Sequence, residues 1–231
     1  MMKKQNILIT GGNRGIGNGL FKLFSVDHNV LITVRDQNKG QDALLSLGHS
    51  KNAVDYVVMD VDDNESVIKA AATIKQKFEN VDLLINNAGI LINEYQLPAI
   101  ETSEDSILKT FNTNTLGVLR VCKSIVPLMS DGGRIINISS GMGQLDEMES
   151  GSTAYRISKT ALNALTKILS NELKPMRIKV NTICPGWVKT DMGGENATLT
   201  VEQSTARIAQ FALMENFPNG QFVRHGEKIP W

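Results

Sequence analysis

Tyr155 and Lys159 place a phenol and an ammonium group four residues apart. On a helix, residues at this spacing share one face, so the two groups would lie close together. A free tyrosine has a pKa of about 10 and gives up its proton reluctantly at neutral pH. A nearby cation favours the phenolate, so we expect the pKa of Tyr155 to be lowered, which would make the phenol an acid for a nascent alkoxide. Two exposed residues on the surface of a helix can have the same spacing, so this interpretation depends on the other motifs of the sequence.

A glycine-rich turn follows the first apolar run and reads Thr10-Gly11-Gly12-Asn13-Arg14-Gly15-Ile16-Gly17. Gly11 permits a tight turn, Gly15 lets the backbone approach a pyrophosphate, and Gly17 lets the next helix lie close to the sheet. The free N–H groups at the start of that helix favour an anion. A plain strand-to-helix turn could have the same composition, but the position between the first strand and a helix favours a dinucleotide site.

The end of the second apolar run predicts which dinucleotide is bound. An acidic residue there binds the ribose 2′-hydroxyl of NAD, whereas an arginine suits the 2′-phosphate of NADP. The run ends in Val34-Arg35-Asp36. We expect Arg35 and Arg14 to close on one phosphate from two sides, which favours NADP(H). In the alternative, Arg35 is a solvated charge and Asp36 binds the ribose, one position beyond the expected place.

The positions of these groups require a regular framework of strands and helices. Apolar runs rich in Ile, Val and Leu predict strands at 5–10, 29–34, 54–59, 82–86, 134–139, 178–183 and 221–223. Amphipathic segments predict helices at 16–26, 39–47, 64–78, 104–128, 153–173 and 201–214. Continuous apolar strands indicate burial on both faces. The alternation predicts an α/β fold with a doubly wound parallel sheet of about seven strands, helices on both faces, and one domain over residues 1–231.

Several further polar segments follow the predicted strands and should meet at the carboxyl edge of the sheet, where open α/β folds bind ligands. They are Asp60-Val61, Asn86-Asn87-Ala88-Gly89, Ser139-Ser140 and Pro185-Gly186-Trp187-Val188-Lys189-Thr190. Strand ends of the Asn-Gly type are common, and Asp60 could simply cap a helix, so each segment alone is weak.

Taken in this order, the motifs resemble the short-chain dehydrogenase/reductase family, most of all its single-domain, carbonyl-reductase-like members. The resemblance extends from Thr10 to about Thr190. It implies a Rossmann fold and an NAD(P)-dependent oxidoreductase with four catalytic residues. By position, Tyr155 would be the general acid and Lys159 would bind the nicotinamide ribose, where the positive nicotinamide ring also favours the phenolate.

The resemblance also implies roles for Ser140, which would polarise the substrate carbonyl, and for Asn114, which would hold a water of a proton relay. Ser139 is the competing serine, and Ser140 is favoured by its distance from Gly143. The complete set of expected cofactor-binding residues is Gly11, Asn13, Arg14, Gly15, Ile16, Gly17, Arg35, Asp60, Val61, Asn87, Ala88, Gly89, Tyr155, Lys159, Pro185, Gly186, Val188 and Thr190.

Composition narrows the other possibilities. Lys+Arg and Asp+Glu are both 24, so the net charge is zero and nothing favours a nucleic-acid partner. Cys122 and Cys184 stand 62 positions apart without clustered histidines, which argues against a disulfide framework and a metal site. No apolar run is long enough for a membrane span. The basic amino terminus is followed only by Ile7-Leu8-Ile9, too short for a secretory signal. We therefore expect a cytoplasmic protein.

The leading hypothesis is an NADP(H)-dependent reductase of aldehydes or ketones that takes a small-molecule substrate. The alternatives are an NAD-dependent alcohol dehydrogenase and a dinucleotide-binding sensor without turnover. The spacer before Tyr155 carries Asp146, Glu147 and Glu149 as a polar lip, and the short segment after Thr190 suggests an open substrate site. The apolar stripe of helix 153–173 is too broad for one core-facing side, so we expect a homo-oligomer, in the first place a dimer.

Overall fold

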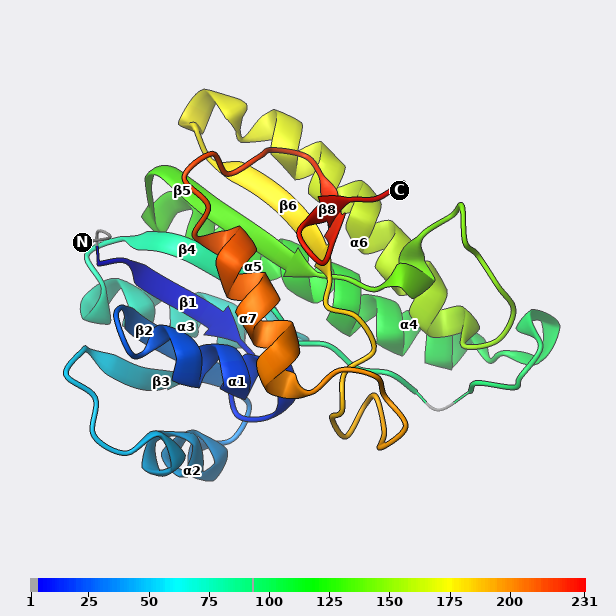
Figure 1. Cartoon of the computed structure of the whole chain (residues 1–231), viewed down its shortest axis with the longest axis horizontal. Coiled ribbons are helices and arrows are strands. Elements are labelled where there is room, and N and C mark those ends of the chain that lie inside the picture. The colour runs from blue at the N-terminus through cyan, green and yellow to red at the C-terminus, as the bar shows by residue number, and fades with distance from the viewer. Residues whose placement is uncertain (1–3, 93) are drawn as a thin grey trace.

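The central sheet has eight strands in the order β3-β2-β1-β4-β5-β6-β7-β8 in a computed structural model that describes residues 4–92 and 94–231 (Figure 1). Residues 1–3 of the basic amino terminus lie outside the described residues. The strands are β1 (Asn6–Thr10), β2 (Asn29–Val34), β3 (Val54–Val58), β4 (Val81–Asn86), β5 (Met129–Ile138), β6 (Lys179–Cys184), β7 (Phe222–Arg224) and β8 (Glu227–Lys228). Neighbours from β3 to β7 pair in parallel, and β8 pairs antiparallel with β7.

Helices cover both faces of the sheet, as the apolar runs predict. They are α1 (Gly15–Phe24), α2 (Gln37–Leu47), α3 (Asn64–Lys77), α4 (Glu104–Phe111), α5 (Gly117–Ile125), α6 (Thr153–Glu172) and α7 (Val201–Ala212). Alternate strand residues serve the two faces: Leu8 packs with residues of α3, α5 and α6, whereas Ile7 and Ile9 pack with residues of α1, α2 and α7. The predicted fold class is therefore confirmed.

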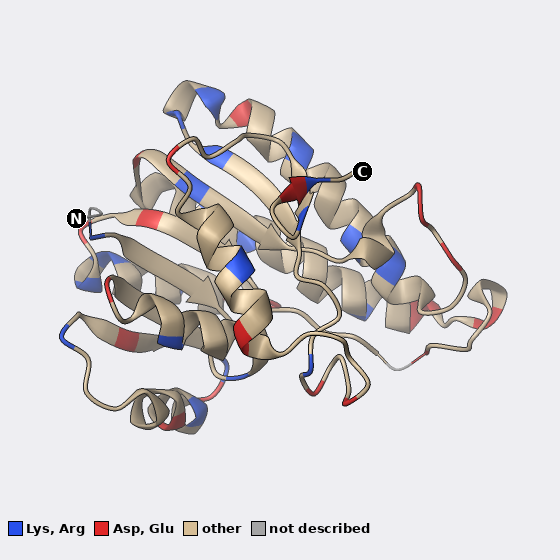
Figure 2. Cartoon of the chain, viewed as in Figure 1, with Lys and Arg blue, Asp and Glu red and all other residues tan. Residues whose placement is uncertain are grey.

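Charge is distributed over helices and loops, while the central strands are mainly apolar (Figure 2). Acidic and basic residues are interspersed, and neither kind gathers on one side in this view. No described helix is both long enough and apolar enough to cross a lipid bilayer.

Two elements differ from the sequence-based prediction. The sheet has an eighth strand, β8, which the sequence did not predict because it is only two residues long and has no apolar run. The predicted helix 104–128 is divided into α4, a π-helical turn at Asn112–Leu116, α5 and a 3-10 turn at Val126–Leu128. The hydrophobic pattern does not reveal a π-turn because the same face stays buried on both sides of it.

The strand order reverses between β1 and β4, since β1 pairs with β2 on one side and with β4 on the other. Connections leave the sheet in opposite directions at such a point, and their carboxyl-end loops separate to form a crevice. The glycine turn and the segment after β4 both enter this crevice.

Candidate active site

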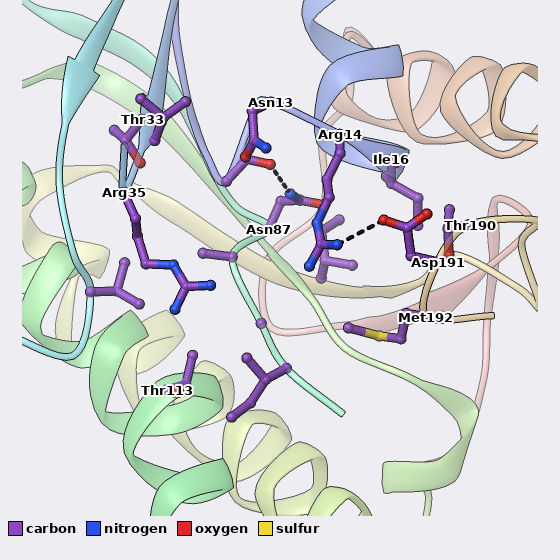
Figure 3. Close-up of a pocket in the computed structure, with 18 of the residues that line it drawn as sticks. Asn13, Arg14, Ile16, Thr33, Arg35, Asn87, Thr113, Thr190, Asp191 and Met192 are labelled. Atoms are coloured by element: carbon purple, nitrogen blue, oxygen red, sulfur yellow. Dashed lines mark hydrogen bonds and ion pairs between the residues drawn. The ribbon is translucent and has the colours of Figure 1, made fainter. Parts of the chain in front are cut away.

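A cavity of about 500 Å³ opens at the carboxyl edge of the sheet (Figure 3). It brings together most of the predicted cofactor residues: Gly11, Asn13, Arg14, Gly15, Ile16, Arg35, Val61, Asn87, Ala88, Gly89, Tyr155, Lys159, Pro185 and Thr190. Ser139, the competing serine, also lines it. The sequence reasoning missed other lining residues, namely Thr33, Val34, Lys39, Asp42, Met59, Asp62, Ile90, Thr113, Ile138, Asp191 and Met192. Most of the missed residues adjoin a predicted motif, so proximity in sequence was the available signal.

The glycine turn has the backbone geometry that an anion site needs. Gly11 and Gly15 have φ of +67° and +52°, which a side chain would make strained. The first turn of α1 receives no side-chain cap, so its N–H groups are free to bind an anion. Gly17 serves packing instead, because a Cβ there would lie 2.2 Å from the Gly11 carbonyl oxygen. It does not line the cavity, which corrects its assignment as a contact residue.

Asn87 holds this turn in place from the neighbouring strand end. Its Nδ2 donates hydrogen bonds to the carbonyl oxygens of Thr10 and Gly11, each at 3.0 Å. The Thr10 hydroxyl accepts from the backbone N–H groups of Asn87 and Ala88, also at 3.0 Å. The Asn87 Nδ2 group is thus already engaged, and its contribution to the cavity is mainly to fix the walls.

Arg35 and Asp36 have different surroundings at the end of β2. The Asp36 carboxylate caps α2 by accepting a hydrogen bond from the Lys39 backbone N–H at 3.1 Å, and Asp36 does not line the cavity. Arg35 lines it, and within residues 4–92 and 94–231 its guanidinium has no hydrogen-bond or ion-pair partner. Lys39 adds a second cation at this end. A doubly charged phosphate fits this pair of cations. The alternative, in which Asp36 binds the ribose of NAD, is disfavoured because the Asp36 carboxylate caps α2.

Arg14 does not join Arg35, contrary to the prediction that the two would close on one phosphate. Its guanidinium is turned toward the loop after β6 and forms an ion pair with Asp191 at 2.7 Å (Figure 3). Asp191 is 177 positions away in sequence, so local spacing could not have indicated this partner.

Asp60 is also corrected. Its carboxylate turns back on its own loop to accept a hydrogen bond from the Asp62 N–H at 3.1 Å, and it does not line the cavity. Val61 and Asp62 do, and the Asp62 carboxylate accepts from the Thr113 hydroxyl at 2.9 Å.

Tyr155 and Lys159 are buried together on α6, at 9% and 4% exposure. The Lys159 ammonium lies 5.6 Å from the centre of the Tyr155 ring and donates to the Ile138 carbonyl oxygen at 2.8 Å. Burial lowers the pKa of Lys159 to about 8. Burial also raises the pKa of Tyr155, against a smaller opposing effect of a hydrogen bond with Ser140. We expected Lys159 to lower the pKa of Tyr155. For the protein by itself this is wrong, because the loss of solvation of the phenol outweighs the effect of a cation that faces the ring.

Ser139 and Ser140 separate clearly in this structure. Ser139 is buried, and its hydroxyl donates to Asn163 Oδ1 at 2.7 Å. The Ser140 hydroxyl lies against the Tyr155 phenol and accepts from the Met142 N–H at 3.1 Å. The contact with the phenol favours Ser140, whereas Ser139, and not Ser140, is among the residues that line the cavity.

Asn114 lies in the π-helical turn and is fully buried. Its Oδ1 accepts from the Ile90 N–H at 2.8 Å, and its Nδ2 donates to the Ile90 carbonyl and to Ser158 Oγ at 2.9 and 3.0 Å. Both Nδ2 hydrogens are used, and the side chain fixes the loop residue Ile90, directly after Gly89. The structure therefore places Asn114 behind the site and does not support its side chain as a water ligand.

The segment after β6 closes the remaining side. Pro185 and Thr190 line the cavity, whereas Gly186 and Val188 do not. Gly186 has a φ of +84°, and Val188 is buried and forms a bridge with Leu199. These two predicted contact residues shape the loop. On the open side, the Tyr95 hydroxyl donates to the Met192 carbonyl oxygen at 3.4 Å.

The site as a whole fits a dinucleotide with an additional phosphate. It offers two glycines at positive φ, a helix start without a side-chain cap, the cations of Arg35 and Lys39, and a buried phenol. Among the described residues, no three or more His, Cys, Asp or Glu side chains are grouped so that they could hold a metal ion. Cys122 and Cys184 are free and buried.

Comparison with known proteins gives a consistent result. A family model described as short chain dehydrogenase matches residues 5–199. Carbonyl reductase (NADPH) 1 of Pongo abelii is 29% identical, with 97% of each chain covered. The structure of carbonyl reductase Sniffer of D. melanogaster has a TM-score of 0.90 and 32% identity, covering 99% of this chain and 100% of that one. An NADPH-bound carbonyl reductase from chicken fatty liver has a TM-score of 0.88 and 30% identity, with 100% of both chains covered.

Proposed function

This chain belongs to the short-chain dehydrogenase family, and we propose that it is an NADP(H)-dependent reductase that converts aldehydes or ketones to alcohols. The observation that carries the proposal is the buried Tyr155 phenol, with the Ser140 hydroxyl against it and the Lys159 ammonium beneath its ring. The similar proteins whose names specify NADPH and carbonyl reduction support the same reading.

Arg35, Lys39 and the N–H groups at the start of α1 would hold the phosphates of the cofactor, and Lys159 would hold its nicotinamide ribose. Bound NADPH supplies the hydride. Ser140 donates a hydrogen bond to the substrate carbonyl oxygen and stabilises the charge that develops there. Tyr155 then transfers its phenolic proton to that oxygen, which becomes the alcohol hydroxyl.

The Tyr155 side chain holds its proton at neutral pH, which is the state that the acid of a carbonyl reduction needs. Burial raises its pKa further, so the phenol by itself is a weaker acid than a free tyrosine, and the transfer of its proton depends on stabilisation of the phenolate by Ser140 and Lys159. The same residues serve both directions of the reaction, so the observation that disfavours the NAD-dependent alcohol dehydrogenase is the use of Asp36 as a helix cap.

The deciding experiment is a panel of small aldehydes and ketones, with consumption of NADPH or NADH followed by absorbance. We expect turnover with NADPH, and we expect Tyr155→Phe to lower kcat by about 10²- to 10⁴-fold without weakening NADPH binding. NADPH binding without any turnover, unchanged in Tyr155→Phe, would instead support a dinucleotide-binding sensor.

We also propose a homodimer that pairs α4 and α6 with their symmetry mates. The two helices pack against each other, and they expose Leu108, Ile157 and Ile168 to solvent. Exposed apolar residues on one surface are typical of an interface. Sedimentation should give twice the mass of the chain, and Ile157→Glu should yield the monomer.

The two free cysteines support a cytoplasmic location, which fractionation of cells would test.

A further inference from the structure

Gly141, the residue after Ser140, lies directly beneath the guanidinium group of Arg224. A Cβ at Gly141 would be 2.5 Å from Arg224 Nη2, so no larger side chain fits unless the guanidinium moves. On its other side, the Gly141 N–H donates to the sulfur of Cys184 at 3.1 Å. The backbone next to Ser140 is therefore fixed between the ends of β6 and β7.

The same guanidinium reaches two more positions of this loop. Arg224 Nη2 donates to Gln144 Oε1 at 3.1 Å and to Glu147 Oε2 at 3.2 Å. Gln144 is buried, whereas Glu147 is exposed. Arg224 ends β7 and pairs in register with Cys184 of β6, so its own backbone is part of the sheet. One planar cation thus connects the sheet to the loop that begins at Ser140.

This loop, residues 141–152, connects Ser140 to the helix that carries Tyr155. From the side of α6 it is held by the Gly143 carbonyl oxygen, which accepts from Thr160 Oγ1 at 3.1 Å and Asn163 Nδ2 at 3.0 Å. From the other side it is held by Arg224 and by a hydrogen bond from the Leu145 N–H to the Trp231 carbonyl at 3.2 Å. The far end of the loop is held separately, by Arg156, which donates to Glu149 and to the Ser150 and Gly151 carbonyl oxygens. Arg224 is the side chain that holds the end nearest Ser140, so we expect its removal to let Ser140 shift.

We propose that Arg224 is a positioning residue of the reaction, which acts through Gly141 and Gln144 to hold the Ser140 hydroxyl against the Tyr155 phenol. The inference rests on the proposed function of that site. It assigns a role in the active site to β7, which contributes no residue to the cavity. The exposed contact with Glu147 is secondary, since exposed ion pairs contribute little.

The test compares Arg224→Ala and Arg224→Lys with one control, Arg177→Met. The control removes another surface arginine, whose ion pair with Asp131 lies at the opposite end of the sheet. We expect Arg224→Ala to lower kcat by about 10- to 100-fold, because displacements near 1 Å can have such effects, while the Kd for NADPH stays within about twofold. Arg224→Lys should recover part of this loss, because an ammonium can donate to Gln144 but cannot also cover Gly141. The Arg177→Met control should keep wild-type kcat.

A second readout does not depend on turnover. The chain has three tyrosines, so 3-fluorotyrosine gives few fluorine resonances, and Tyr155→Phe identifies that of residue 155. This resonance should shift in Arg224→Ala and stay unchanged in Arg177→Met. Wild-type kcat together with an unshifted resonance would overturn the inference, as would a parallel loss of kcat and NADPH affinity. If Arg224→Ala does not fold, the same criteria apply to Arg224→Lys. A wild-type chain that reduces no carbonyl refutes the proposed function, and the fluorine resonance then decides the positioning of Ser140 alone.

Discussion

The hydroxyl groups of Ser139 and Ser140 face different partners although the residues are adjacent. Ser139 Oγ donates to Asn163 Oδ1 at 2.7 Å inside the protein, whereas the Ser140 hydroxyl lies against the Tyr155 phenol. Successive side chains of an extended segment point to opposite sides, which explains the division. Ser139 therefore packs against α6 at the cavity wall, whereas the Ser140 hydroxyl is the one that contacts the phenol.

We predict opposite effects for the two alanine variants. Ser140→Ala should lower kcat by about 10²- to 10³-fold, because a donor to the developing oxyanion is lost. Ser139→Ala should instead lower the free energy of unfolding by about 1–3 kcal/mol, because Asn163 loses a buried hydrogen bond. Steady-state kinetics and urea unfolding measure the two effects. Loss of catalysis mainly in Ser139→Ala would contradict the assignment.

Lys159 should make stability depend on pH in a defined direction. Burial lowers its pKa from 10.5 in the unfolded chain to about 8 in the folded protein. Between these values the unfolded state binds more protons, so the free energy of unfolding should rise with pH, by at most about 1.4 kcal/mol per pH unit. Above about pH 10 the raised pKa of Tyr155 should lower the free energy of unfolding as the pH rises, because the phenol of the unfolded chain loses its proton first.

Lys159→Met provides the control for this prediction. Urea unfolding of both proteins across the interval should show a rising difference between wild type and variant. Equal pH dependence in the two proteins would mean that the buried ammonium keeps an ordinary pKa in the folded state.

Arg35 and Asp36 should have separable roles. Arg35→Ala should weaken NADPH binding by about 10- to 100-fold and leave NADH binding nearly unchanged, because a charged hydrogen bond to the 2′-phosphate is lost. Asp36→Ala should keep the ratio of the two affinities and lower the free energy of unfolding by about 1 kcal/mol, since it removes the cap of α2. Quenching of tryptophan fluorescence gives both affinities. A changed ratio in Asp36→Ala would show that Asp36 contacts the ribose.

The ion pair between Arg14 and Asp191 joins the glycine turn to the loop after β6. Both side chains are mostly exposed, so Asp191→Asn should change stability by less than about 1 kcal/mol. Release of NADPH should nevertheless become a few-fold faster, because the two walls of the cavity are no longer connected. Stopped-flow dissociation measures this rate. Glu65→Gln breaks the exposed Lys69–Glu65 pair of α3 and should leave the rate of NADPH release unchanged.

Features encoded within a few residues were predictable from the sequence. The glycine turn, the strand ends and the Tyr155–Lys159 spacing each depend on local backbone geometry, and each of these segments contributes residues to the cavity, although Gly17, Asp60, Gly186 and Val188 do not line it. The assignment of helix 104–128 as one continuous helix was wrong because a π-turn leaves the hydrophobic pattern intact. The two-residue strand β8 was missed because it forms only by pairing with β7.

The errors in the candidate site share a cause. Asn114, Arg14 and Asp60 each have the residue type that their predicted roles require, but their polar atoms are taken by other partners. The pKa of Tyr155 was predicted in the wrong direction because burial could not be quantified from spacing.

The sequence by itself determined the order of strands and helices, the glycine turn and the residue types available at the carboxyl edge of the sheet, since all of these follow from local propensity and periodicity. The tertiary structure alone decided which of those side chains face the cavity, which are already hydrogen-bonded, and that Arg224 covers Gly141. Such partners lie far apart along the chain, and desolvation depends on everything packed around a group.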